Sequence, residues 1–418
     1  MLEPDSKDLL ASQLCYVGRH VPHFRESGCD DGRPLEEFPL TFKPQIRNDY
    51  AAFISDEFLN VRRPLVAFLT AKDIGLGDTT GGYTWEVYFG NNIVVAETTG
   101  TSGTVLRCPK TLADCIRLGI GMWRQRRSFD SLVRPGNLLP LIHRGLTPVR
   151  YNPWNFEPFN VKSIYEEIRD GGFRWVHCRA DFLQTHIAVL RREGWRPSLP
   201  NLKVIEVMGH FLHQKVAADL AEFFEVEIVD HYGMLETWTI AMTCRHSVLH
   251  INEHNVHVEI IDERDQPVRL GETGRIVVTS LQERLMPFVR YVTDDFGMFV
   301  EKRCHCGPGT KTLVLVEGRS GNVIKGAAEP VFGDLFFMDV LRNLNRFDWR
   351  SIHIKQMALD DFILETNFIS EPLALITSLE KETGTLLGVP VRFQHAVLND
   401  AEVAAQQRQK PWVFRCEC

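Results

Sequence analysis

The sequence contains no apolar run as long as a membrane-spanning helix, and no long run of Lys or Arg. A spanning helix takes about 20 predominantly apolar residues, so no membrane partner is expected. The net charge of −7 argues against a general nucleic-acid binder, because phosphate neutralisation needs a basic face. A nucleotide as a small ligand is compatible with this charge. The first residues, MLEPDSKDLL, carry acids where a secretory signal has bases, so we expect a cytoplasmic protein.

Cysteine patterns typical of disulfide-rich proteins are also missing. Ten cysteines in 418 residues, without a secretory signal, predict no disulfide framework. Only Cys304 with Cys306, and Cys416 with Cys418, lie close together. Five others are scattered and are expected to be small buried hydrophobic residues: Cys15, Cys29, Cys108, Cys115 and Cys178.

Length and pattern predict an α/β protein with more than one core. A chain of 418 residues exceeds what one hydrophobic core normally serves, and 44% hydrophobic with 24% charged residues is an ordinary globular composition. Asn92–Glu97 is expected to be a strand that leads through a loop into a helix. Leu202–Gly209 and Val226–Asp230 are expected strands on either side of a helix that ends near Phe224. Strands that alternate with helices favour a mainly parallel sheet. In the helix after Asn92–Glu97, four apolar residues recur at helical spacing: Leu112, Ile116, Ile120 and Trp123.

From about His250 the pattern changes to short β segments, HVEIIDE, GRIVVTS and FVRYVT, which predict a β-subdomain. After residues 318–322 a new α+β unit begins, with strands in IHIKQM, FILETNF and VPVRF and a helix from about Pro372 to Leu387. We therefore predict an N-terminal domain at residues 1–317, a hinge at residues 318–321 and a C-terminal cap domain at residues 322–418. Gly321 suits the hinge because it lacks a Cβ.

The segment from Thr98 to Arg107, TTGTSGTVLR, holds two glycines and five hydroxyl side chains. Such a loop can wrap a phosphate, since glycine lets backbone N–H groups approach and hydroxyls donate hydrogen bonds. It lacks the Gly-Lys-Ser/Thr ending of a Walker loop, which excludes a P-loop ATPase. Taken alone, the segment is also compatible with a polar surface turn.

Three further motifs make the loop part of a family pattern. The loop resembles the phosphate-binding loop of adenylate-forming enzymes, in the form found in the phenylacetate–CoA ligase branch, and the other three follow in the family's order. The matching loop residues are Thr99, Gly100, Thr101, Ser102 and Gly103. The other matches are Tyr232, Gly233 and Glu236 in HYGMLET, Arg290, Tyr291, Thr293 and Asp295 in FVRYVTDDFGMF, and Gly318, Arg319, Ser320, Ile324 and Lys325 in EGRSGNVIK.

The resemblance implies a two-domain fold with ATP bound between the domains. It implies that Thr98 and the loop residues hold phosphates, that Glu236 helps bind Mg²⁺, and that Tyr232 packs on adenine, with Gly233 also among the nucleotide-binding residues. Asp295 would accept both ribose hydroxyls, with Arg319 beside it; an ionised carboxylate accepts two hydrogen bonds at once. For Glu236 the alternative is a solvated acid after a turn.

Two more residues are candidates for the reacting centre. His210, in VIEVMGHF, stands where the branch usually has an acid, which places it near the predicted carboxylate or adenine pocket; a partly buried structural histidine is the equal alternative. Lys410, in QQRQKPWVF, resembles the lysine that the family brings onto the substrate carboxylate and α-phosphate. A solvated lysine in a loop is its alternative.

A second group of residues suggests zinc. Four soft ligands in two close pairs can form a closed tetrahedral zinc site, and reduced structural thiols are the alternative. The Cys-His-Cys-Gly at residues 304–307 is similar to a Cys-Pro-Cys-Gly that the branch often carries. The resemblance implies a set made of Cys244, His250, Cys304 and Cys306, with His250 preferred over His246.

The predicted function is activation of a carboxylic acid with ATP to an acyl-adenylate, followed by transfer to CoA or another thiol, such as that of a carrier protein. The 26 Phe and 8 Trp fit an aromatic acid and equally fit core packing. An amide-forming synthetase, with an amine as acceptor, is the enzyme alternative. Leu235, Asp294 and the segment GAAEP depart from the family pattern and keep open a degenerate relative that binds nucleotide without turnover. A homodimer is a candidate assembly.

Overall fold

The computed structural model describes residues 6–29, 32–71, 86–90, 92–98, 106–141, 150–151, 157–209, 212, 214–301, 304, 312–319, 323–324, 331–332, 352–366, 372–397 and 412–416. The chain packs as two compact units, the first formed mostly by residues up to 315 and the second mostly by residues from 316 onward. The predicted hinge at residues 318–321 stays a prediction.

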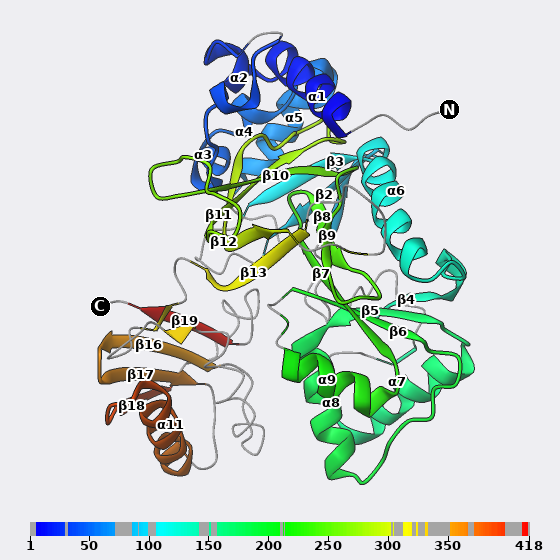
Figure 1. Cartoon of the computed structure of the whole chain (residues 1–418), viewed down its shortest axis with the longest axis vertical. Helices are drawn as coiled ribbons and strands as arrows, with labels where there is room; N and C mark the ends of the chain where they lie inside the picture. Colours follow the sequence, from blue (N-terminus) through cyan, green and yellow to red (C-terminus); the bar gives the residue numbers. More distant parts are fainter. Residues whose placement is uncertain are drawn as a thin grey trace. The chain divides into compact units, whose positions relative to one another are not determined.

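The first unit begins with short helices, in a segment to which the sequence patterns give no fold. They are α1 (Ser6–His20), α2 (Pro22–Glu26), α3 (Lys43–Asn48), α4 (Tyr50–Phe53) and α5 (Leu59–Thr70). Val17, Phe24 and Phe38 are fully buried and share a core with Val289, which lies far along the chain. Figure 1 shows these helices gathered in blue around the N-terminal end of the chain. The N-terminal helices therefore pack against the segment that precedes β12.

A ten-stranded mixed sheet forms the centre of this unit, in the order β10-β11-β12-β13-β9-β8-β7-β6-β5-β4. Its strands are β4 (Leu138–Pro140), β5 (Trp175–Arg179), β6 (Val204–Met208), β7 (Glu227–Met234), β8 (Trp238–Thr243), β9 (Leu249–Ile251), β10 (Val256–Ile261), β11 (Gly274–Ser280), β12 (Tyr291–Val300) and β13 (Thr312–Arg319). Strands β4 to β7 pair in parallel, whereas β7, β8 and β9 pair antiparallel. The expected α/β architecture with an added β-subdomain is confirmed.

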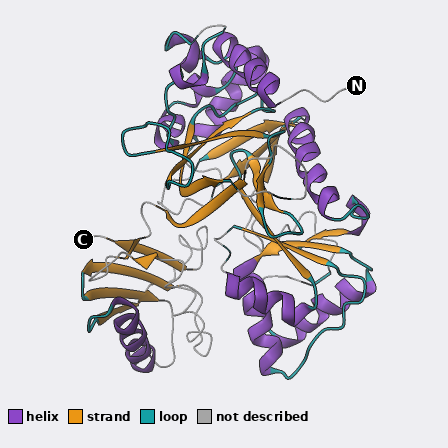
Figure 2. Ribbon diagram, in the orientation of Figure 1, coloured by secondary structure: helices purple, strands orange, loops and turns teal. Residues whose placement is uncertain are grey.

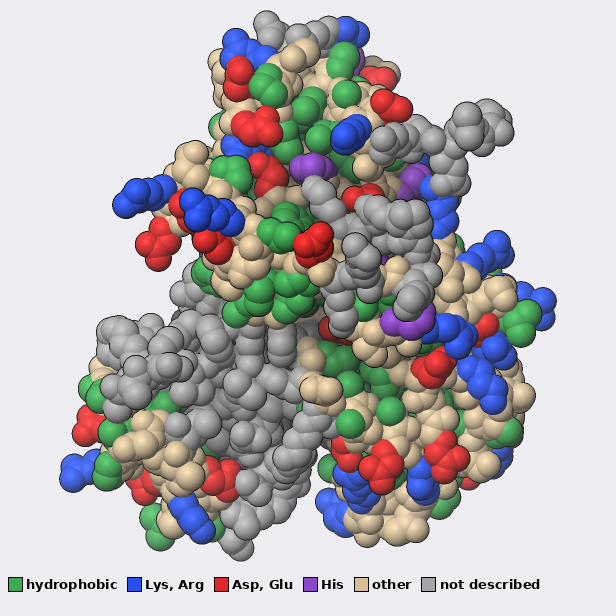
Figure 3. All heavy atoms as spheres, in the orientation of Figure 1, with side chains coloured by type: hydrophobic (Ala, Val, Ile, Leu, Met, Phe, Trp, Pro, Cys, Tyr) green, Lys and Arg blue, Asp and Glu red, His purple; other side chains and the backbone are tan. Residues whose placement is uncertain are grey.

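Helices cover the parallel half of the sheet (Figure 2). They are α6 (Leu112–Phe129), α7 (Pro158–Asp170), α8 (Ala180–Arg192) and α9 (Gln214–Phe224). Phe129 of α6 packs with Trp175, Val204 and Val229 of the sheet. Strands β5 and β6 are buried along their length, as expected where helices cover the sheet. On the face drawn in Figure 3, acidic and basic side chains are interspersed over α7–α9, as on an ordinary solvated surface.

The expected order of strand, loop and helix after Asn92 is wrong. The Gly/Ser/Thr loop connects two antiparallel strands, β2 (Ile93–Glu97) and β3 (Arg107–Thr111), and β1 (Glu86–Phe89) completes a three-stranded sheet. Helix α6 begins only after β3. Strand β3, with sequence RCPKT, carries two basic residues and a proline, so its pattern does not suggest a strand.

Helix α6 also buries a different face from the one its apolar spacing suggests. Leu112, Ile116 and Ile120 are 39%, 66% and 42% exposed. The buried residues of α6 are Asp114, Leu118, Gly121, Arg126 and Phe129. Polar partners decide this orientation: Asp114 accepts hydrogen bonds from the N–H groups of Thr111 and Arg284. The helix was predictable from spacing, but its buried face was not.

The second unit contains a four-stranded sheet, ordered β18-β17-β16-β19, with α11 (Pro372–Leu387) against it. Its strands are β16 (Ile352–Ala358), β17 (Asp361–Thr366), β18 (Arg392–Val397) and β19 (Trp412–Cys416), and a separate pair is formed by β14 (Val323–Ile324) and β15 (Val331–Phe332). Phe362 stacks on Phe393 with ring centroids 5.0 Å apart. The predicted helix and the three predicted strands of the α+β cap are confirmed.

Among the described residues, no helix combines the length and apolarity needed to cross a bilayer. Of the five scattered cysteines, Cys29, Cys108 and Cys178 are buried as expected. Cys15 and Cys115 are partly exposed, so the expectation of full burial is wrong for these two.

Candidate active site

The carboxyl edge of the parallel strands defines the candidate site. Strands β4, β5 and β6 end at Pro140, Arg179 and Met208, while β7 continues through Tyr232 and Gly233. In open α/β sheets, ligands bind outside the carboxyl ends of the strands. The Tyr232-Gly233 motif therefore lies where this fold places a ligand.

Gly233 is required by the path of the backbone. A Cβ at this position would lie 2.6 Å from the carbonyl oxygen of Trp238 and 3.0 Å from Nε2 of His231. The pairing of β7 with β8 also shifts register between Tyr232 and Gly233, so the motif forms a local irregularity in the sheet. Any larger residue would push the two strands apart.

Glu236 lies in the turn between β7 and β8 and is buried, which excludes the alternative of a solvated acid. The Tyr291 hydroxyl donates a hydrogen bond to Glu236 Oε1 at 3.0 Å. The Lys110 ammonium donates to the Glu236 carbonyl oxygen at 2.6 Å. Side chain and backbone of Glu236 are thus fixed by residues from β12 and β3.

Lys110 also forms a buried ion pair with Glu283. The distance from Lys110 Nζ to Glu283 Oε1 is 2.5 Å, and the two side chains are 4% and 1% exposed. Burial works against the charged ammonium, but the Glu283 carboxylate outweighs it and raises the pKa of Lys110. Neither residue belongs to a motif, so the sequence does not single them out. A lysine shortly before the predicted helix is the only local signal for the pair.

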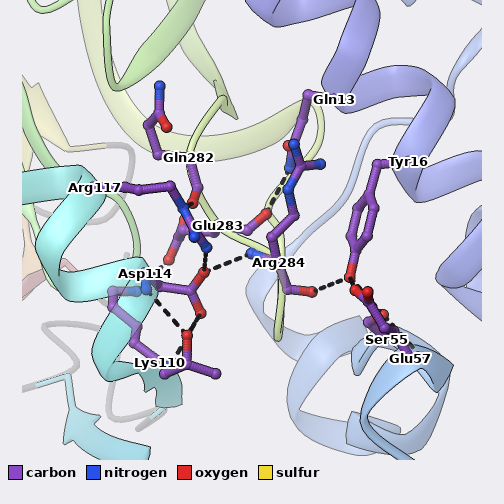
Figure 4. Close-up of polar contacts among 11 residues, drawn as sticks. Gln13, Tyr16, Ser55, Glu57, Lys110, Asp114, Arg117, Gln282, Glu283 and Arg284 are labelled. Atoms are coloured by element: carbon purple, nitrogen blue, oxygen red, sulfur yellow. Dashed lines mark hydrogen bonds and ion pairs between the residues drawn. The ribbon is translucent and has the colours of Figure 1, made fainter.

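Glu283 belongs to a connecting segment, residues 281–290, that joins several distant elements (Figure 4). Gln13 of α1 donates to the Glu283 carbonyl oxygen at 2.8 Å. The backbone N–H of Arg284 donates to Asp114 of α6 at 2.9 Å, and Tyr16 donates to the Arg284 carbonyl oxygen at 3.0 Å. This segment leads directly into Tyr291, so the position of Glu236 depends on the N-terminal helices as well.

The base of the Gly/Ser/Thr loop is closed by Thr98. Its hydroxyl accepts a hydrogen bond from the Leu106 N–H at 2.9 Å, and its own N–H donates to the Leu106 carbonyl oxygen at 2.9 Å. The buried Thr98 hydroxyl therefore holds the loop's two ends together. The remaining predicted phosphate-binding residues lie outside the described residues: Thr99, Gly100, Thr101, Ser102 and Gly103.

Of the other predicted site residues, two lie on strands and two lie outside the described residues. Asp295 lies on β12, and Arg319 is the last residue of β13. Asp294, where the family has glycine, adopts a φ of +64°. Glycine adopts this left-handed conformation freely and aspartate tolerates it, so this departure preserves the backbone path. His210 and Lys410 lie outside the described residues.

Cys244, His250 and Cys304 come together although 60 residues separate the two cysteines. Their ligand atoms all lie within 4.8 Å of one another, and the two sulfurs are 3.6 Å apart. Two Zn–S bonds of about 2.3 Å in tetrahedral geometry place their sulfurs about 3.8 Å apart, so the spacing fits a shared zinc ion. Burial lowers the pKa of His250, which favours the neutral imidazole that binds metals. His246 Nδ1 is 3.7 Å from the Cys304 sulfur, and Cys306 lies outside the described residues.

Comparison with known proteins confirms the fold. The chain matches a 2-hydroxyisobutyryl-CoA ligase solved in the postadenylation state with 2-HIB-AMP, at a TM-score of 0.63 and 18% identity, over 94% of this chain and 86% of that chain. It matches the same ligase, with 2-HIB-AMP and CoA in the thioesterification state, at a TM-score of 0.57 and 17% identity, over 99% of this chain and 90% of that chain. At these identities the comparison shows the adenylate-forming enzyme fold.

A sequence relative supports the same resemblance. The chain is 23% identical over 154 residues to a phenylacetate–coenzyme A ligase of Thermus thermophilus. That alignment covers 36% of this chain and 35% of the relative, so it spans about a third of either protein. No protein-family model matches the chain. The resemblance to the phenylacetate–CoA ligase branch is thereby confirmed.

Proposed function

We propose that this protein activates a carboxylic acid with ATP, forming an acyl-adenylate and pyrophosphate, and then transfers the acyl group to the thiol of CoA. The observation that carries the proposal is the fold match, over nearly the whole chain, to a CoA ligase whose structures hold an acyl-adenylate and CoA. The buried carboxylate of Glu236, in the turn after Tyr232-Gly233, supplies the polar centre that such a site needs.

The chemistry explains the demand for these residue types. An oxygen of the substrate carboxylate bonds to the α-phosphorus of ATP, and the bond to the pyrophosphate leaving group breaks. Two anions must therefore meet while negative charge grows on the phosphate oxygens. In our proposal the loop residues 98–103 hold the phosphates and Lys410 gathers the two anions. Asp295 binds the ribose, with Arg319 beside it, and His210 lies near the acid.

Magnesium fits Glu236. Mg²⁺ is usually held by one or two carboxylates together with substrate phosphates, and it offsets phosphate charge. The Tyr291 hydroxyl fixes one oxygen of the Glu236 carboxylate, which orients this hard oxygen ligand. We propose that Glu236 helps to hold the Mg²⁺ that accompanies ATP.

Zinc fits the second cluster. Two thiols and an imidazole, gathered from β9 and from the segments after β8 and β12, are soft ligands typical of structural zinc sites. We propose that Cys306 supplies the fourth ligand, which would give closed coordination and a purely structural role. The ion would then fix the segment after β12 to the β8–β9 turn.

The direct test is hydroxylamine trapping of acyl-adenylates across a broad panel of acids, aromatic acids included. We expect hydroxamate formation with a narrow group of acids, dependent on ATP and Mg²⁺, and abolished in Glu236→Ala. Nucleotide binding without hydroxamate or pyrophosphate release from any acid would identify a degenerate relative instead. With the best acid, competition between CoA and amines separates the thiol ligase from an amide-forming synthetase. The cytoplasmic location and a homodimeric assembly remain predictions.

A further inference from the structure

A buried polar cluster lies next to the Tyr232-Gly233 motif. Its centre is Glu206 of β6, which is fully buried. Arg126 of α6 donates to both carboxylate oxygens of Glu206, at 2.7 and 2.9 Å. The Trp175 indole N–H of β5 donates to Oε2 at 2.7 Å. Nδ1 of His231, on β7, lies 2.6 Å from Oε1. The cluster thus joins α6 to three of the four parallel strands, β5, β6 and β7.

The charge state of Glu206 fixes Nδ1 of His231 as a hydrogen-bond donor. Burial favours the neutral acid, but Arg126 and His177 outweigh it and hold the pKa of Glu206 well below its usual range. An ionised carboxylate only accepts hydrogen bonds, so Nδ1 of His231 carries the proton. The other ring nitrogen, Nε2, therefore lies on the opposite edge of the ring, away from Glu206.

The Nε2 edge of the His231 ring faces the Tyr232-Gly233 motif. Nε2 of His231 lies 3.0 Å from the place where a Cβ on Gly233 would be, so the ring fills the space next to the Gly233 backbone. The ring of His177 stacks against it, with centroids 5.5 Å apart and planes 17° apart. His231 is thus fixed at one edge by Glu206 and on one face by His177. It is also the chain neighbour of Tyr232.

We infer that His231 is a positioning residue: held by Glu206, it sets the backbone of Tyr232 and Gly233 for nucleotide binding. This inference rests on the function proposed above and on the expectation, implied by the family resemblance, that Tyr232 packs on adenine and that Gly233 is a nucleotide-binding residue. His231 itself does not contact the nucleotide in this account. Its role is to connect the strand that carries the motif to the buried Arg126–Glu206 pair, so that the backbone of Tyr232 and Gly233 is held in one position.

A metal site made of the same residues is the competing interpretation. The ligand atoms of His177, Glu206 and His231 all lie within 4.8 Å of one another, which is compatible with a divalent ion. However, Glu206 already accepts hydrogen bonds on both oxygens, and two of them come from the Arg126 guanidinium. A divalent cation would lie close to this buried positive charge, which is strongly unfavourable. The geometry therefore favours positioning over metal binding.

Two substitutions at position 231 separate positioning from general packing. His231→Phe keeps a ring but removes the donor to Glu206, whereas His231→Asn keeps a donor close to the Nδ1 position. His186 provides a matched control, because it is also fully buried and its Nδ1 contacts a polar partner, the Tyr165 hydroxyl, at 3.1 Å. The control variant is His186→Phe. Each variant is tested for ATP binding by calorimetry and for acid-dependent pyrophosphate release.

We expect His231→Phe to raise the KM and Kd for ATP about tenfold with kcat within about twofold, the pattern of lost uniform binding. His231→Asn should recover most of the affinity, and His186→Phe should leave the ATP affinity unchanged. Two results would overturn this inference but not the proposed function. One is an equal loss of ATP affinity in both His231 variants, and the other is unchanged ATP affinity in His231→Phe while the wild type is active. A divalent ion retained in Cys304→Ser and lost in His177→Ala would establish the metal site instead. Failure of the wild-type protein to bind ATP would overturn the proposed function, and the inference with it.

Discussion

At the scale of single residues, the contact between Tyr291 and Glu236 makes a specific prediction about magnesium. Tyr291→Phe removes only the hydroxyl that donates to Glu236 Oε1. Loss of such an outer partner typically weakens metal binding by about tenfold or more. We expect the Mg²⁺ concentration for half-maximal pyrophosphate release to rise about tenfold, with the rate at saturating Mg²⁺ largely retained.

Tyr165→Phe is the matched control, because Tyr165 is also buried but bonds to His186 on α8. Its Mg²⁺ dependence should equal that of the wild type. An unchanged Mg²⁺ requirement in Tyr291→Phe would show that Glu236 does not need this hydroxyl, and would count against its role as a metal ligand.

Lys410 gives a second prediction at this scale, based on the sequence. An ammonium on a flexible stem suits the task of gathering two anions when a cap closes. Lys410→Ala should lose roughly 3 kcal/mol of transition-state stabilisation in adenylation, about a hundredfold in rate. Transfer from a pre-made acyl-adenylate to CoA should continue. Equal loss of both half-reactions would indicate a folding defect, and unchanged adenylation would exclude this role for Lys410.

At the scale of elements, the Arg126–Glu206 pair joins α6 to β6 and should give stability a characteristic pH dependence. The folded-state pKa of Glu206 lies well below its ordinary value of 4.5. Its contribution to the free energy of unfolding is therefore fully present above about pH 4.5 and is lost as pH falls through the folded-state pKa. Glu206→Gln should flatten this acid limb.

Glu206→Gln also leaves the Arg126 guanidinium buried without its counter-charge. It should lower the free energy of unfolding at pH 7 by about 3 to 5 kcal/mol. Chemical denaturation between pH 3 and 7, with wild type and variant side by side, measures both effects. Parallel stability curves for the two proteins across this range would show that the pKa of Glu206 is the same in the folded and unfolded states, which would contradict the account.

The zinc cluster makes a prediction about the connection between β8, β9 and the segment after β12. Protein purified without chelators should contain about one zinc per chain, as a closed tetrahedral site implies. Cys304→Ser should lose the metal and melt at a lower temperature. Cys115→Ser is the control, since Cys115 is also partly exposed and lies on α6. Equal zinc content in Cys304→Ser and Cys115→Ser would contradict the proposed zinc site.

At the scale of the whole molecule, elements with a clear local pattern were predictable from the sequence. Strands β6 and β10 and helix α11 follow the expected segments, because alternation and helical spacing depend on neighbouring residues. Strand β3 could not be recognised, since its short polar sequence is stabilised by pairing with β2. The expected two-domain fold was predicted from four motifs in the family's order and not from the pattern of buried residues.

Candidate site residues can be proposed from the sequence where a motif marks them and not elsewhere. Tyr232 and Gly233 lie near the end of β7 and Glu236 lies in the turn that follows, so their proximity follows from their spacing in the sequence. Lys110 and Glu283 are 173 residues apart, so only the folded chain brings them together. The Glu206 cluster is equally hidden, because its members come from three strands and a helix with no shared motif.

The central claim concerns the complete reaction, and one single-turnover experiment tests it most directly. Protein is mixed with ATP, Mg²⁺, CoA and the acid selected by hydroxylamine trapping, and all products are quantified together. Our account predicts AMP, pyrophosphate and acyl-CoA in equal amounts, with acyl-adenylate accumulating when CoA is left out. ADP and phosphate as products, or acyl-CoA formed without AMP, would contradict it.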